Sequence, residues 1–146
     1  MTNIVQVTDI QGETVAVSTI GPTTSGTPAI SATTAVAVLT GLAPTTGGTP
    51  VYTTYKVNSL LIANAGSADA TVSVQFNAYD VVNTTDVRTT FVNAVVIPVG
   101  ATLDVLSAPV YLNNDSTAKT DKIEVFATGA DVNALVSYEA IKSTTA

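Results

Sequence analysis

The stretch Lys122–Ile141, KIEVFATGADVNALVSYEAI, carries the strongest strand signal in the chain. Apolar and polar residues alternate on both sides of Gly129-Ala130-Asp131, which is the pattern of two half-buried strands. Glycine and aspartate are residues that suit a tight turn. We therefore predict a β-hairpin here. Phe126 and Leu135 fall on its outward face, where another strand or a subunit can cover them.

The composition indicates one domain with a largely uncharged surface. A chain of 146 residues is long enough to bury a sizeable core without metals or disulfides, and it contains no cysteine. Charged residues make up 11%, against about 25% in an ordinary soluble domain. A neutral, hydroxyl-rich surface favours a protein whose faces become covered on assembly.

Charge and hydropathy argue against several classes of partner. The net charge is −6 and the five Lys and Arg residues are scattered, so no cationic face is predicted for nucleic acid. No apolar run approaches the ~20 residues of a membrane-spanning helix. The first residues lack the basic and apolar regions of a signal peptide, so we expect synthesis in the cytoplasm.

The first fifty residues differ in character from the rest. Residues 3–20 predict a short hairpin that turns at Gly12, whereas residues 21–50 are rich in Pro, Gly and Thr and leave room for one strand, Ala35–Leu39. This stretch is either a solvated linker or an arm that orders on a neighbouring subunit, and its apolar AVAVLTGL segment favours the arm. The predicted subunit contacts are Val36, Val38, Leu39, Leu42, Phe126 and Leu135.

From residue 51 the strand signal is continuous. Residues 51–63 predict one long strand, or two strands separated by a bulge, because the apolar parity switches near Asn58. Residues 70–77 predict the hairpin partner. Residues 80–90 predict a surface loop that carries Arg88, and residues 91–99 predict a central strand because they are apolar on both parities. Short strands are expected at 102–106 and 110–112, before a polar loop at 113–121.

Many short strands separated by turn clusters are typical of an all-β sandwich or barrel. We predict an antiparallel β-sandwich, of jelly-roll or immunoglobulin-like topology, with an extended Pro/Thr-rich N-terminal part. Residues 1–50 would form the hairpin and arm, and residues 51–146 the sandwich domain.

The reactive groups are few, since both histidine and cysteine are missing. Asp115 with Asp121 or Asp131 could form the carboxylate pair of a glycosidase or hold calcium, but each sits where aspartate favours a turn. No nucleotide-binding or nucleophile motif is present. We predict no enzymatic activity, no cofactor, no metal and no small-molecule substrate.

Five tyrosines are the remaining candidates for recognition: Tyr52, Tyr55, Tyr79, Tyr111 and Tyr138. Tyrosines on strands mostly pack in the core or at sheet edges, whereas an exposed group of them would form a platform for a sugar or a protein.

The order of strand motifs from Tyr55 to Ile141 resembles that of small β-sandwich virion proteins of tailed bacteriophages. The matching segments are Ala70-Thr71-Val72-Ser73-Val74, Ile97-Pro98-Val99-Gly100, Val110-Tyr111-Leu112 and Lys122-Ile123-Glu124-Val125. Such proteins decorate the capsid or form rings at the neck, collar and tail, and they have no catalytic residues. The resemblance covers the last two thirds of the chain and leaves out the part before Val51.

This resemblance implies a virion structural protein of the capsid decoration or cement type, or else a neck, collar or tail ring protein. Its partners would be itself, as a symmetric homo-oligomer, and other virion proteins. It would be made in the host cytoplasm and end in the virion. A glycan-binding fibre tip and a hydrolase are the rival interpretations.

Overall fold

The computed structural model describes residues 5–18, 30, 36–41, 51–80, 84–116, 119–129 and 131–145. These residues form strands and connecting turns, with no helix among them, and hence no helix that is long and apolar enough to cross a membrane. The strands are β1 (Val5–Ser18), β2 (Val36–Thr40), β3 (Val51–Asn64), β4 (Ala70–Asp80), β5 (Thr85–Ile97), β6 (Thr102–Asp104), β7 (Val110–Leu112), β8 (Asn114–Ser116), β9 (Lys119–Thr120), β10 (Lys122–Ala127) and β11 (Val132–Thr145).

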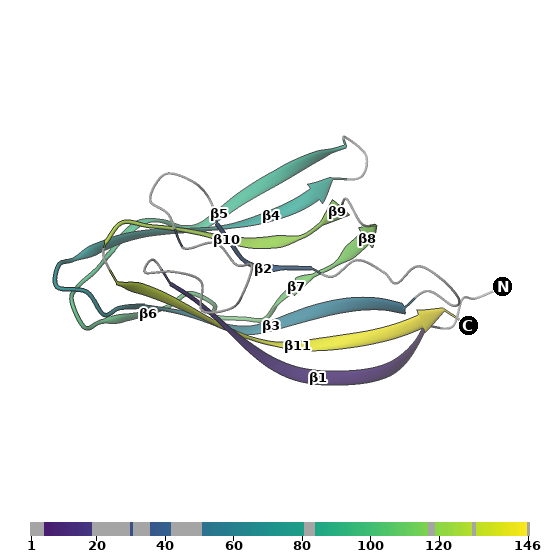
Figure 1. Cartoon of the computed structure of the whole chain (residues 1–146). Helices are drawn as coiled ribbons and strands as arrows, with labels where there is room; N and C mark the ends of the chain where they lie inside the picture. The colour runs from purple at the N-terminus through teal and green to yellow at the C-terminus, as the bar shows by residue number, and fades with distance from the viewer. Residues whose placement is uncertain are drawn as a thin grey trace.

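Two antiparallel sheets face each other and form a sandwich (Figure 1). Sheet A has the order β1-β11-β3-β6, with β7 also paired to β3, and sheet B has the order β2-β10-β4-β5. Strands β8 and β9 form a small separate ribbon. The predicted all-β antiparallel sandwich is confirmed.

Aliphatic residues from the facing sides of both sheets make one core. Sheet A contributes Val57, Leu60, Ile62 and Val136, and sheet B contributes Val72, Val74, Ile123 and Val125, all fully buried. β-Branched side chains fill a pleated surface well, and each one buried stabilises the fold by roughly 1.5 to 3 kcal/mol.

The bulge predicted in residues 51–63 is confirmed. In β3, Ser59 pairs with Ser137 of β11 and Val57 pairs with the next residue, Tyr138, which leaves Asn58 as the extra residue. Because a one-residue insertion flips the side-chain alternation, Val57 and Leu60 both point into the core although their parity differs.

The predicted hairpin at Lys122–Ile141 is wrong in its pairing. Both strands exist, but β10 pairs with β2 and β4 in sheet B, whereas β11 pairs with β1 and β3 in sheet A. The turn at Gly129, where φ is +123°, therefore carries the chain from one sheet to the other. A Cβ at this glycine would lie 3.0 Å from the Cβ of Ala70, so both space and conformation require glycine here.

The predicted hairpin between residues 51–63 and 70–77 is wrong for the same reason. Strand β3 belongs to sheet A and β4 to sheet B, so the turn between them also joins the two layers. The two turns lie against each other: Ala65 N donates to Asp131 O at 2.8 Å, and Thr128 N donates to Thr71 O at 2.9 Å.

The expected N-terminal hairpin around Gly12 is replaced by one long strand. Strand β1 runs through Gly12, which pairs with Glu139, and its partner along the whole length is β11. Glycine also adopts the extended backbone of a strand, so the presence of Gly12 does not by itself indicate a turn.

The strand predicted at residues 35–39 is observed as β2, paired antiparallel with β10. Its residues Val36, Val38 and Leu39 are buried in the chain's own core, as is Ile30. The described part of the expected arm is thus part of the body, and strands from both sides of the expected boundary at residue 50 share the same two sheets. The division of the chain into two parts at residue 50 stays a prediction, which the melting of a fragment 51–146 can test.

Candidate assembly edge

Strand β5 lies at the edge of sheet B, and among the described strands only β4 pairs with it. Thirteen residues long, it rises with β4 away from the rest of the sandwich (Figure 1). An edge strand presents unpaired backbone N–H and C=O groups, which makes it a template for pairing with another chain.

Sequence reasoning missed this edge. Residues 80–90 were expected to form a loop, but Thr85 to Thr90 form the first half of β5. Residues 91–99 were expected to form a central strand, whereas 91–97 are the second half of this edge strand. They are apolar on both parities because two bulges, at Phe91 and at Asn93–Ala94, change which side chains point inward. Ala94 lies in the left-handed region, with φ +50°, and its N–H donates to Ser73 Oγ at 2.8 Å.

Apolar side chains remain exposed along β5. Val87 lies on the inner face of sheet B, is 46% exposed and pairs with Ala78. Val95 lies on the same face and pairs with the core residue Val72. The Phe91 side chain is partly exposed, and its ring stacks on that of Phe76, with ring centroids 6.4 Å apart. Exposed apolar groups grouped along one edge are typical of a surface that binds another protein.

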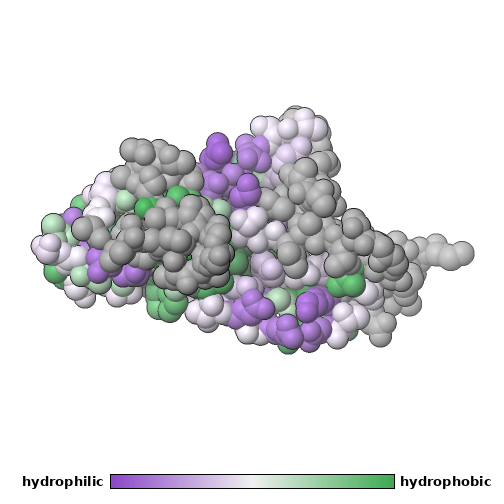
Figure 2. Space-filling view, in the orientation of Figure 1, coloured by the Kyte–Doolittle hydropathy of each residue, from purple (hydrophilic) through white to green (hydrophobic). Residues whose placement is uncertain are grey.

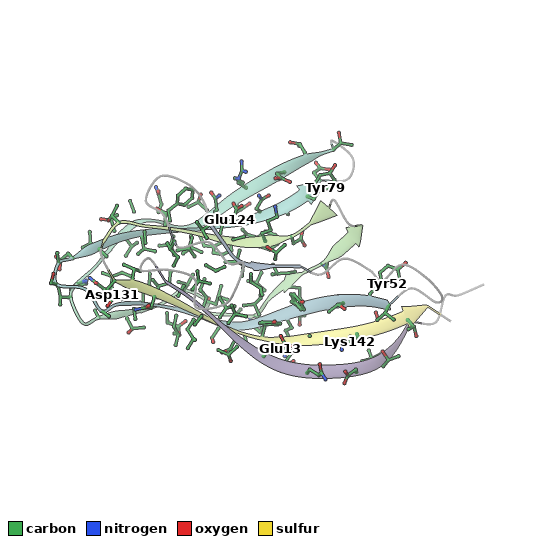
Figure 3. All side chains as sticks on the ribbon, in the orientation of Figure 1. Glu13, Tyr52, Tyr79, Glu124, Asp131 and Lys142 are labelled. Atoms are coloured by element: carbon green, nitrogen blue, oxygen red, sulfur yellow. The ribbon has the colours of Figure 1, made fainter. Side chains whose placement is uncertain are left out.

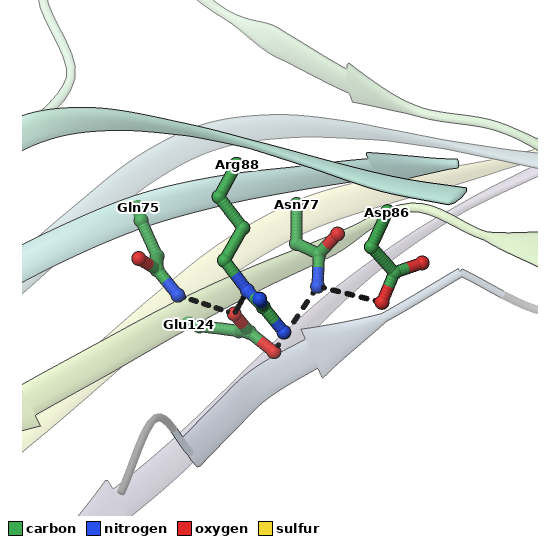
Figure 4. Close-up of polar contacts among 5 residues, drawn as sticks. All are labelled: Gln75, Asn77, Asp86, Arg88 and Glu124. Atoms are coloured by element: carbon green, nitrogen blue, oxygen red, sulfur yellow. Dashed lines mark hydrogen bonds and ion pairs between the residues drawn. The ribbon is translucent and has the colours of Figure 1, made fainter. Parts of the chain in front are cut away.

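On the outer face of sheet B, a buried carboxylate organises the polar side chains beside this edge (Figure 4). Glu124 of β10, 7% exposed, accepts a hydrogen bond of 2.6 Å from Gln75 Nε2 and one of 3.4 Å from Asn77 Nδ2. Arg88 Nε lies 3.6 Å from the same carboxylate. A buried carboxylate needs such partners, because without them burial of the charge would be costly.

Asn77 connects this network to Asp86 of β5. Its amide nitrogen donates to Asp86 Oδ2 at 3.4 Å as well as to Glu124, which fixes the amide orientation because the opposite one would turn an oxygen toward two carboxylates. The Asn77 Oδ1 atom is buried and has no hydrogen-bond partner among the described residues. The network thus holds the two charged residues of β5, Asp86 and Arg88, in fixed positions.

A pocket of about 320 Å³ adjoins the network on the same face. It is lined by Ser73, Val74, Gln75, Thr90, Asn93 and Phe126. Figure 2 shows hydrophilic side chains gathered over β4 and β5, in keeping with this polar outer face. The lining offers neutral hydroxyl and amide groups beside one aromatic ring.

The other long edge, strand β1 in sheet A, also carries two charged residues, Asp9 and Glu13. Asp9 forms an ion pair of 3.4 Å with Lys142, and a bulge lies between Val7 and Asp9. Charged side chains and bulges are devices that discourage edge-to-edge pairing. Of these two long edges, β5 has the longer run without a charged residue, 89–97.

The predicted subunit contacts are dispersed. Val36, Val38 and Leu39 are buried within the chain, Phe126 lines the pocket and Leu135 is exposed on sheet A. Leu42 lies outside the described residues. The structure does not bring the described members of this set together on one surface.

Of the candidate acids, Asp121 and Asp131 do not form a pair with each other. Asp121 and Asp131 flank opposite ends of β10, and each has a structural role. Asp121 accepts from Asn113 N at 2.9 Å, and Asp131 accepts from Asn133 Nδ2 at 3.1 Å. The Asp115 side chain lies outside the described part, and no group of three or more acids in that part could hold a metal.

Two of the five tyrosines are exposed, Tyr52 at 37% and Tyr111 at 50%, and both lie on sheet A. Tyr79 lies on sheet B, in the other layer of the sandwich (Figure 3). The Tyr55 and Tyr138 rings pack together at 4.7 Å on the inner side of sheet A. Burial, and then a hydrogen bond from Tyr138 to Glu13, raise the pKa of Tyr138 well above its ordinary value of 10.0.

Comparison with known proteins finds no matching family model and no matching curated protein. Comparison with solved structures finds chains of infectious bursal disease virus. A chain of the T13 viral particle is 8% identical, with a TM-score of 0.44 over 95% of this chain and 38% of that one. A chain of the Gx strain is 7% identical, with a TM-score of 0.41 over 94% of this chain and 38% of that one.

A chain of the VP2 subviral particle is 10% identical, with a TM-score of 0.39 over 94% of this chain and 39% of that one. This chain therefore spans about two fifths of the length of the viral chains that it matches. At these values the likeness assigns no function to it.

Proposed function

We propose that the chain is a non-enzymatic structural protein of a virion that acts by assembling with copies of itself into a symmetric homo-oligomer. The observation that carries this proposal is the long β5 edge, which leaves Val87, Phe91, Val95 and Val96 exposed. Strand addition to such an edge forms main-chain hydrogen bonds and covers exposed side chains such as Val87. Identical chains that assemble in this way favour closed symmetry.

The virion setting rests on the resemblance of Tyr55 to Ile141 to phage virion proteins. Within that setting, a capsid decoration or cement protein is our first choice, and a neck, collar or tail ring protein is the alternative. Both bind themselves and other virion proteins, and both are made in the host cytoplasm. The low share of charged residues, 11%, also supports a surface that becomes covered.

The inventory of reactive groups supports a role without catalysis. Histidine and cysteine are missing from the sequence, and Asp121 and Asp131 are engaged at opposite ends of β10. General acid and base chemistry needs such groups to converge within hydrogen-bonding reach of a substrate. The described acids do not converge.

The direct experiment is the mass of the whole chain in solution, measured by light scattering across a wide range of concentrations. We expect one oligomeric species, whose mass is a whole-number multiple of the monomer mass and larger than it. A monomer at every concentration would contradict assembly with itself. Detection of the chain by mass spectrometry in purified virions tests the location, and its absence from them would contradict the virion role.

A second candidate is the binding of a neutral glycan, and the pocket beside Phe126 favours it. Its neutral hydroxyl and amide groups can bind sugar hydroxyls, and an aromatic ring can pack on the apolar face of a sugar. A charged ligand would find no counter-charge among the lining residues. The location differs from the tyrosine platform that the sequence suggested.

A glycan array tests this second candidate. Binding that is lost in Phe126→Ala or Asn93→Ala, but kept in Tyr111→Ala, is the expected pattern, because Tyr111 is exposed outside the pocket. An array without any signal would count against glycan binding and would leave self-assembly unaffected.

A further inference from the structure

Only one half of β5 has the regular geometry that strand pairing needs. From Asp80↔Thr85 to Gln75↔Thr90 the register with β4 is unbroken, whereas both bulges lie between Thr90 and Val95. Bulges twist and bend an edge strand and disrupt its ladder. The segment able to accept another strand is therefore Thr85–Thr90.

The charges of this segment have a self-complementary arrangement. Asp86 and Arg88 are the only charged residues of β5, they have opposite signs, and they flank Val87. Alternation along a strand places both charges on the outer face of sheet B and Val87 on the inner face. The partners on β4 agree, because Arg88 lies opposite Asn77 of the outer face and Val87 lies opposite Ala78 of the inner face.

We propose that two copies of the chain pair antiparallel through Thr85–Thr90, about a two-fold axis at Val87. This inference rests on the proposed self-assembly and names its interface. Asp86 of each copy then lies opposite Arg88 of the other, and Val87 lies opposite Val87. The pairing joins two four-stranded sheets into one continuous sheet.

The charges specify this register over its neighbours. Moving the axis to residue 86 places Asp86 opposite Asp86, and moving it to residue 88 places Arg88 opposite Arg88. Like charges directly opposite each other destabilise a strand pair, whereas opposite charges stabilise it. The axis at Val87 is therefore the one that makes both charge pairs favourable.

The polar network prepares both charged residues for this contact. Glu124 and Asn77 hold Arg88 and Asp86 beside the edge, which reduces the entropy that binding would cost. The Arg88 side chain is 56% exposed and its Nε lies 3.6 Å from Glu124. A guanidinium has five N–H groups, so it can also donate to a second carboxylate.

A cysteine at the axis tests the register directly, because the chain contains no other cysteine. Val87→Cys should form a disulfide-linked dimer under mild oxidation, since opposite residues lie within the roughly 7 Å that a disulfide can bridge between Cα atoms. Thr85→Cys and Thr89→Cys are the matched controls. Each alone places its two thiols about 13 Å apart along the strands and should stay uncrosslinked.

A mixture of the Thr85→Cys and Thr89→Cys chains should crosslink, because these positions face each other across the axis. If Thr85→Cys alone crosslinks as readily as Val87→Cys, the register is wrong. If the chain is an oligomer but Val87→Cys does not crosslink, this interface is overturned while self-assembly stands. A monomeric wild type would overturn both.

Charge variants provide a second, independent test. Asp86→Arg and Arg88→Asp each place like charges opposite one another, and each should weaken self-association by about tenfold or more. An equal mixture of the two variants should restore association. In the mixed dimer one chain carries two arginines at positions 86 and 88 and the other carries two aspartates, so both charge pairs across the axis are of opposite sign. Thermal melting of each variant confirms that it is folded. A folded mixture that associates no better than its components would refute the charge pairing.

Discussion

At the scale of single residues, the inner and outer sides of each sheet are sharply separated. Val136 is fully buried, whereas its neighbour Leu135 points to the other side of β11 and is exposed. A carboxylate at a fully buried site without a partner costs more than the net stability of a typical domain.

We therefore expect Val136→Asp, and likewise Val74→Asp, to yield insoluble protein, and Leu135→Asp to stay soluble with a cooperative melt. Soluble fraction and thermal unfolding measure the difference. Soluble, cooperatively melting Val136→Asp would mean that the inward face is wrongly assigned. Loss of the oligomer in folded Leu135→Asp would support the predicted contact at this residue.

Tyr138 gives the fold a dependence on alkaline pH. Burial and the bond to Glu13 raise its pKa in the folded state above 10.0, so the unfolded chain loses the phenol proton first. The stability that this difference contributes is fully present below pH 10 and is lost progressively as the pH rises above it.

Tyr138→Phe should lower the free energy of unfolding at pH 7 by about 1 kcal/mol, through loss of the hydrogen bond, and should make the decline above pH 10 shallower. Urea unfolding at pH 7 to 11 measures both effects. Tyr111→Phe, at an exposed ring, is the control for loss of a hydroxyl at pH 7. An unchanged slope in Tyr138→Phe would contradict the assignment.

At the scale of elements, the alternation of residues located the strands but not their partners. Val51–Asn64 with its bulge, β4, β7, β10 and β11 appear close to where the pattern placed them. All three expected hairpins were wrong, because turn residues such as Gly129 specify a bend in the chain and not the sheet in which the next strand lies.

In the described part of the chain β4 and β5 form a long hairpin, and the first half of β5 was expected to be a loop. The first residues of β5, Thr85 to Thr90, are mostly polar, since they lie on an exposed edge. The candidate site was missed with it. The signal that could have revealed it is the alternation of Asp86, Arg88 and Thr90 with Val87, Thr89 and Phe91.

Asn64 holds together the turns that pass between the two sheets. Its side chain is buried, donates to Ala68 O and Ile97 O at 2.9 Å each, and accepts from Gly66 N at 3.0 Å. These bonds link the turn after β3 to the end of β5.

Asn64→Ala should destabilise the fold by roughly 2 to 4 kcal/mol, because several buried backbone groups lose their partner. Chemical denaturation measures the loss, and Asn58→Ala, at an exposed position, serves as the control. A cost no larger than that of the control would show that the turns hold without this side chain.

At the scale of the whole molecule, the N-terminal strands complete both sheets. Without residues 1–50, β11 and β10 each lose a neighbouring strand, and the core loses Val17, Val38 and Leu39. We expect the fragment 51–146 to show no cooperative thermal transition, in contrast to the full chain. Cooperative melting of the fragment would support the domain boundary at residue 50.

Self-assembly through β5 is the central claim, and hydrogen–deuterium exchange of the unmodified chain tests it most directly. The amides of Thr85–Thr90 should exchange fast in dilute protein and become protected as the concentration rises through the association range, while exchange in β1 stays the same. Protection at Thr85–Thr90 that does not change while the measured mass increases would contradict the claim.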